Sequence, residues 1–121
     1  SAAEFSYLKN KTNRIPKITL PSPGLWANFW SPKYSRDAYP TLDDFLNDIV
    51  AILRDEVTEI VRLGATYIQI DAPHYGLLLD PSTRSYYEGL GWSLDKWLSF
   101  GIELDNAVMT GFHDVTFGFH V

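Results

Sequence analysis

Residues 67–75, with the sequence YIQIDAPHY, decide the fold of this chain. An apolar, β-branched run, typical of a parallel strand that is covered on both faces, ends abruptly at Asp71. Pro73 then removes the N–H that the next ladder hydrogen bond would need. Because ligands in α/β folds bind at the carboxyl ends of parallel strands, Asp71 and His74 are candidate site residues. The alternative is that Asp71 only caps the following turn.

The rest of the chain alternates between predicted strands and helices. Thr41 and Asp44 form a capping-box pattern that predicts the start of a long amphipathic helix, and Gly64 marks its end. A second helix is expected over about 93–110, with Leu98 and Ile102 among its inward-facing residues. Short strands are expected over 15–20 and 114–121, and ordered loops over 25–40 and 76–92. Right-handed crossovers would make the three strands parallel.

This order of elements predicts an α/β fold and a partial (β/α)8 TIM barrel, with residues 1–121 as a single segment. Three parallel strands with helices on one side leave open sheet edges and an uncovered face, and a complete barrel needs about 250 residues. The alternative is a small open α/β sheet that is complete in itself and closed by dimerisation. No glycine-rich phosphate-binding fingerprint follows any of the predicted strands.

Composition excludes several classes of function. The net charge is −5, and the ten basic residues are scattered, so we expect neither nucleic acid nor an anionic membrane as a partner. No apolar run approaches the roughly 18 residues that span a bilayer, and the first residues do not form a signal peptide, so a cytoplasmic location is expected. The absence of cysteine excludes disulfides, and also any thiolate metal site built from this chain alone.

Three short stretches resemble the cobalamin-independent methionine synthases and the related zinc-dependent thiol alkyltransferases. IQIDAP resembles the family's IQIDEP strand, with Ala72 in place of the glutamate. LPSPGLWANFWSP, residues 20–32, resembles the family's TGP…NWS loop, and FGFH, residues 117–120, resembles its zinc-binding strand. The resemblance implies a TIM-barrel methyltransferase that passes a methyl group from a folate-type donor to a thiol such as homocysteine, in methionine biosynthesis.

The resemblance also implies roles for particular residues. Asp71 would bind the amino group of the acceptor, although Ala72 leaves the identity of the thiol open. Ser22 and Trp30 would face the folate donor; alternatively, Trp30 fills the mouth of the barrel. His74 would be a polar contact or proton acceptor in the site, or otherwise a solvated loop histidine.

His120 is the candidate metal ligand. In the family, a histidine at a strand end binds zinc together with the cysteine of a His-x-Cys pair, and this chain ends at Val121, before that cysteine. Zinc would hold the acceptor thiol as a thiolate at neutral pH. With one histidine and no cysteine, the 121 residues alone are expected to bind zinc weakly and to be inactive, so none of them is assigned as catalytic.

Other interpretations stay open. One is a related barrel that acts on another thiol, on an epoxide or on a corrinoid-carried methyl group, or a decarboxylase similar to the uroporphyrinogen enzymes. Another is a non-catalytic module that recruits a protein. A half-barrel is also expected to self-associate through its open sheet edges.

Overall fold

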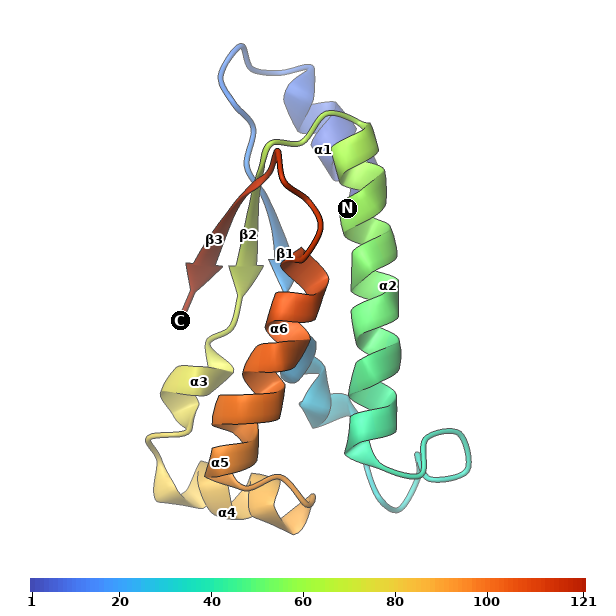
Figure 1. Ribbon diagram of the computed structural model, residues 1–121, viewed down its shortest axis with the longest axis vertical. Helices are drawn as coiled ribbons and strands as arrows, with labels where there is room; N and C mark the ends of the chain where they lie inside the picture. The colour runs from blue at the N-terminus through green and yellow to red at the C-terminus, as the bar shows by residue number, and fades with distance from the viewer.

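A computed structural model describes residues 1–121 and shows an α/β fold built on one parallel sheet (Figure 1). The sheet has three strands in the order β1-β2-β3, formed by Ile18–Pro21, Tyr67–Asp71 and Thr116–His120. Both pairings are parallel. The predicted α/β class and the parallel direction of the strands are therefore confirmed.

The register gives the sheet two different faces. Side chains alternate along each strand, so every second residue points to the same side. One face is apolar and consists of Ile18, Leu20, Ile68, Ile70, Phe117 and Phe119. The first five pack into or against the core, whereas Phe119, near the end of β3, is 44% exposed. The opposite face, called here the open face, is half-buried to exposed and carries Thr19, Tyr67, Gln69, Asp71, Thr116, Gly118 and His120.

Helix α2, Leu42–Arg62, covers the apolar face together with helix α6, Ile102–Met109, and the two lie side by side (Figure 1). The predicted capping box is present, since Thr41 accepts a hydrogen bond from Asp44 N and Asp44 accepts one from Thr41 N. The helix buries one stripe, Leu42, Leu46, Ile49, Val50, Leu53, Val57 and Ile60. Gly64 follows with a φ of 100°, the left-handed conformation that favours glycine after a helix.

The connections are more structured than the sequence indicated. A short helix, α1 (Ala2–Lys9), buries Phe5 against the core, and a 3-10 helix, η1 (Pro23–Phe29), follows β1. The segment expected to be a loop over 76–92 contains α4 (Pro81–Gly89), and its first two residues belong to α3 (His74–Leu77).

The second predicted helix is interrupted by a π-helical turn. It consists of α5 (Leu94–Lys96), the π-helix η2 (Trp97–Gly101) and then α6. Because a π turn contains an extra residue, it shifts the buried face. Leu98 and Ile102, expected to face inward, are instead 52% and 42% exposed.

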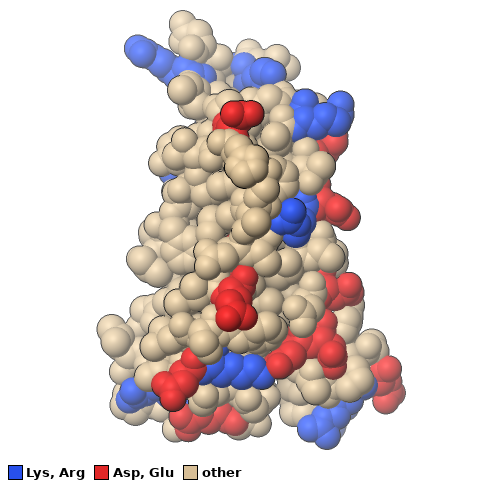
Figure 2. All heavy atoms as spheres, viewed as in Figure 1, with Lys and Arg blue, Asp and Glu red and all other residues tan.

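Charged side chains do not form a continuous basic surface. On the face shown in Figure 2, Lys and Arg are interspersed with Asp and Glu, and a broad uncharged area lies over β3. None of the helices combines the length and the apolar character needed to cross a membrane.

Candidate functional site

Asp71 and His120 meet at the carboxyl ends of β2 and β3. They are direct partners in the parallel register, and His120 Nδ1 lies 3.0 Å from Asp71 Oδ1. Both side chains are on the open face, with 32% of the Asp71 side chain and 61% of the His120 side chain exposed. The main chain fixes the strand ends, because Ala72 N donates to His120 O at 2.7 Å and Ser22 N to Asp71 O at 2.8 Å.

Two further polar residues extend this pair into a row across the open face. Lys17 Nζ, just before β1, donates to Gln69 Oε1 at 2.6 Å, and Gln69 Nε2 donates to Asp71 Oδ1 at 2.6 Å. We call Lys17, Gln69, Asp71 and His120 the polar row. The sequence analysis did not identify Lys17 or Gln69. Gln69 could have been found from strand alternation, since it is two residues before Asp71 and must share its face.

Two side-chain atoms of the polar row make no hydrogen bond within the chain. Both hydrogen bonds to Asp71 end on Oδ1, and Oδ2 has no hydrogen-bond partner. A carboxylate oxygen accepts hydrogen bonds only, so it suits an ammonium group. His120 contacts Asp71 through Nδ1, and its Nε2 makes no hydrogen bond.

These residues fit one ligand position of a zinc centre, not a complete site. No group of three or more His, Cys, Asp or Glu side chains in the chain could hold a metal ion. A zinc-bound histidine normally donates its other ring N–H to a carboxylate or carbonyl, and the Asp71–His120 pair has that arrangement. The other ligands of such a centre would have to come from outside these 121 residues.

Ser22 lies away from the open face. It is fully buried, caps η1 by accepting from Gly24 N, and donates through Oγ to Asp105 Oδ1 at 2.5 Å. Its side chain therefore points toward α6, on the helix-covered side of the sheet.

Asp105, on α6, is a buried acid that the sequence analysis missed. It is 2% exposed and accepts hydrogen bonds from Ser22 Oγ and from Tyr75 Oη, the latter at 2.8 Å. Burial raises the pKa of Asp105 above its ordinary value, although the two hydroxyl groups oppose the shift. Burial, and then the Asp105 charge, raise the pKa of Tyr75. The position of Asp105 in the apolar stripe of the helix, between Leu104 and Val108, could have indicated that it is buried.

His74 is buried among aromatic rings rather than solvated in a loop, so that expectation was wrong. It has no exposed surface, its ring centroid lies 5.2 Å from that of Trp97, and neither ring nitrogen has a hydrogen-bond partner. Burial lowers the pKa of His74 to about 4, which keeps the ring neutral at pH 7. The structure does not bring it to the polar row.

Trp30 is also in the core. It is 4% exposed, and its Nε1 donates to Tyr39 O at 3.1 Å. The structure therefore brings Asp71 and His120 together, and it places Ser22, His74 and Trp30 elsewhere.

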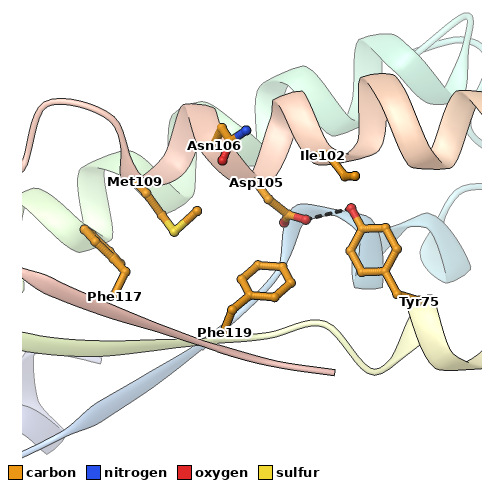
Figure 3. Close-up of a pocket in the computed structure, with 7 residues that line it drawn as sticks. All are labelled: Tyr75, Ile102, Asp105, Asn106, Met109, Phe117 and Phe119. Carbon is orange, nitrogen blue, oxygen red and sulfur yellow. Dashed lines mark hydrogen bonds between the residues drawn. The ribbon is translucent and has the colours of Figure 1, made fainter.

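A cavity of about 390 Å³ lies between α6 and β3, on the helix-covered side of the sheet (Figure 3). Figure 3 shows Asp105 and Tyr75 hydrogen-bonded at one end of it and Phe119 beneath them. The full lining is Tyr75, Ile102, Asp105, Asn106, Met109, Phe117 and Phe119. Since Phe117 and Phe119 alternate with Gly118 and His120, this cavity and the polar row are on opposite faces of the sheet.

Comparison with known proteins gave two relatives. The chain is 32% identical over 94 residues, 78% of its length, to the 5-methyltetrahydropteroyltriglutamate–homocysteine methyltransferase of Thermosynechococcus vestitus. It is 32% identical over 71 residues, 58% of its length, to the methionine synthase of Pyrococcus abyssi. The matched segments span 12% and 20% of those two proteins. No protein-family model and no solved structure matches the chain.

Proposed function

This chain is similar to a segment of the methionine synthases, as its motifs predicted, and from that premise we propose that the protein containing it transfers a methyl group to a thiol. The observation that carries the proposal is the Asp71–His120 pair at adjacent strand ends. In enzymes built on parallel strands, the groups that bind the reactants are at this end of the sheet.

The proposed setting is a (β/α)8 barrel, of which these residues would form three strands and their helices. The two faces of the sheet support this proposal. The face covered by α2 and α6 is apolar, whereas the open face carries the polar row. If further strands closed the sheet, the open face would line the interior and the polar row would lie at the mouth of the barrel.

Within that site, Asp71 and His120 have different proposed roles. Asp71 Oδ2 accepts a hydrogen bond from the ammonium group of an amino-acid acceptor such as homocysteine, which is a charge-assisted interaction. His120 Nε2 is one ligand of a zinc ion. Zinc, when bound, keeps the acceptor thiol deprotonated at neutral pH. The proposed methyl donor is of the folate type. Trp30 and Ser22 are buried, so we do not propose that they contact it.

Ala72 favours a second candidate acceptor. It stands where the family motif has glutamate, and its side chain is fully buried. A site without that second carboxylate attracts an ammonium group less strongly. The second candidate is therefore a methyltransferase or alkyltransferase whose thiol acceptor is not homocysteine.

The test is a methyl-transfer assay on the complete gene product, supplied with zinc, 5-methyltetrahydropteroylglutamate and a panel of thiols with and without an amino group. We expect turnover with at least one thiol, loss of turnover in His120→Ala, and unchanged turnover in the matched control His113→Ala. His113 precedes β3 at the opposite end of the strand. Equal turnover in both variants would contradict the assigned site, and no turnover of any thiol by the zinc-loaded protein would contradict methyl transfer.

A further inference from the structure

We infer that Gln69 and Lys17 are positioning residues that orient the Asp71–His120 pair, so that Asp71 Oδ2 and His120 Nε2 are the atoms presented to ligands. The inference rests on the proposed function for the identity of those ligands. Its geometric basis is the polar row, which runs from the residue before β1 across β2 to β3.

The charges at the two ends of the row determine how Gln69 must point. The Lys17 ammonium can only donate hydrogen bonds, and the Asp71 carboxylate can only accept them. A glutamine between them satisfies both only with its oxygen toward Lys17 and its NH₂ group toward Asp71. The structure has this orientation, with 2.6 Å from Lys17 Nζ to Gln69 Oε1 and 2.6 Å from Gln69 Nε2 to Asp71 Oδ1.

The orientation of Gln69 in turn fixes the carboxylate of Asp71. Oδ1 accepts from Gln69 on its own strand and lies 3.0 Å from Nδ1 of His120 on the neighbouring strand. With two donors on Oδ1, Oδ2 is left for another group. Without Gln69, the Asp71 side chain could rotate and exchange its two oxygens.

The same contact selects the tautomer of His120. A carboxylate oxygen cannot donate, so the ring nitrogen that faces it must carry the proton. Nδ1 is therefore the protonated nitrogen in the neutral ring, and Nε2 keeps the lone pair that can coordinate a metal ion. Glycine at position 118, the register partner of Gln69, places no side chain beside the amide.

The direct test is ¹⁵N NMR of the histidine rings in the metal-free complete gene product, at about pH 8.5. The variants are Gln69→Leu, which removes both amide groups, and Lys17→Met, which removes the ammonium at a more exposed position. Thr116→Val is the matched control, because it changes a residue of the open face outside the polar row. Circular dichroism verifies that each variant is folded.

We expect the Nδ1–H tautomer of His120 to predominate in the wild type and in Thr116→Val. Its population should fall clearly in Gln69→Leu and to a smaller extent in Lys17→Met. An unchanged tautomer population in both folded row variants would overturn the inference, as would a wild-type ring protonated mainly on Nε2. If Gln69→Leu does not fold, the inference is tested by Lys17→Met alone, and an unchanged tautomer population in that variant would overturn it.

A second readout is zinc affinity, measured with zinc alone on the complete gene product. Removing an outer-shell partner of a zinc ligand weakens metal binding by about 10–100-fold. Gln69 contacts His120 only through Asp71, so it is one residue further from the zinc ion than an outer-shell partner. We therefore expect a rise in the zinc Kd of up to about 10-fold in Gln69→Leu, and none in Thr116→Val. A protein that binds no zinc but shows the predicted tautomer shift would contradict the proposed function and leave the positioning role intact. A protein that binds zinc but shows no tautomer shift in the variants would contradict only the positioning role.

Discussion

His120 Nδ1 lies 3.0 Å from Asp71 Oδ1, although the two residues are 49 positions apart in the sequence. The parallel register of β2 and β3 makes them direct partners, and each is the last residue of its strand. The contact therefore depends on the sheet itself rather than on a loop. It gives the proposed site a rigid base, because the position of both side chains follows from the pairing of two strands.

Substitutions of Asp71 should separate its two proposed roles. In Asp71→Asn, the amide oxygen can still accept from His120, but an NH₂ group can replace the oxygen that faces the acceptor. We expect KM for an amino-acid thiol to rise about 10-fold or more, with zinc retained, because a charge-assisted hydrogen bond contributes about 1.5–3 kcal/mol. Asp71→Ala removes both contacts and should also weaken zinc binding. Zinc titration and steady-state kinetics of the complete gene product measure both effects, and loss of zinc in Asp71→Asn would rule out the acceptor-binding role.

His74 should make the chain less stable in mild acid. Its folded-state pKa is lowered to about 4 from an ordinary 6.5, so the unfolded chain binds a proton in this range that the folded chain does not. The titration of His74 therefore does not reduce the free energy of unfolding above about pH 6.5. As the pH decreases toward 4, this free energy falls by at most about 3 kcal/mol. Denaturant unfolding of wild type and His74→Leu at several pH values tests this. The difference between their unfolding free energies should change with pH, and parallel curves would contradict the burial of His74.

Asp105 should contribute a pH dependence of the opposite sign. Its folded-state pKa is raised by burial, so the folded chain holds a proton that the unfolded chain has released. Its contribution is fully present below the ordinary pKa of 3.8 and is lost as the pH rises through the raised folded-state value. The variant Asp105→Asn does not titrate at this position. As the pH rises from 3.8 through the folded-state pKa of Asp105, the free energy of unfolding of the wild type should therefore fall relative to that of the variant. A difference that is constant with pH would show that Asp105 is not desolvated.

Gly24 is the tightest position next to His74. A Cβ atom there would lie 2.5 Å from His74 Nε2 and 2.8 Å from a Trp97 ring carbon. Since neither buried ring can move freely, Gly24→Ala should reduce the free energy of unfolding by about 1–3 kcal/mol. Gly76→Ala is the control, because a Cβ there meets nothing within 4 Å and should change stability little. Thermal or denaturant unfolding measures both, and a neutral Gly24→Ala would contradict the packing around His74.

The elements that could be predicted are those with strong local signals. The capping box at Thr41 and Asp44 predicted the start of α2 correctly, and Pro73 predicted the end of β2. The π turn at Trp97–Gly101 has no comparable local signal, and its Trp97 packs against Trp92, which lies outside the turn, and against His74, which lies in another helix. The exposure of Leu98 and Ile102 was missed for that reason.

The candidate site was predictable to the same extent. Strand ends and the resemblance identified Asp71 and His120 as candidates, but their shared face and their contact required the register. His74 follows Asp71 by only three residues, yet it belongs to helix α3 and turns into the core. Asp105 was missed because an acid on a helix is usually solvated, and only tertiary packing shows that Ser22 and Tyr75 donate to it.

The most direct test of the central claim is the zinc content of the complete gene product, by elemental analysis of wild type and His120→Ala purified without chelators. The account predicts near-stoichiometric zinc in the wild type and its loss in His120→Ala. A zinc-free wild type, or a variant that retains all of its zinc, would contradict it.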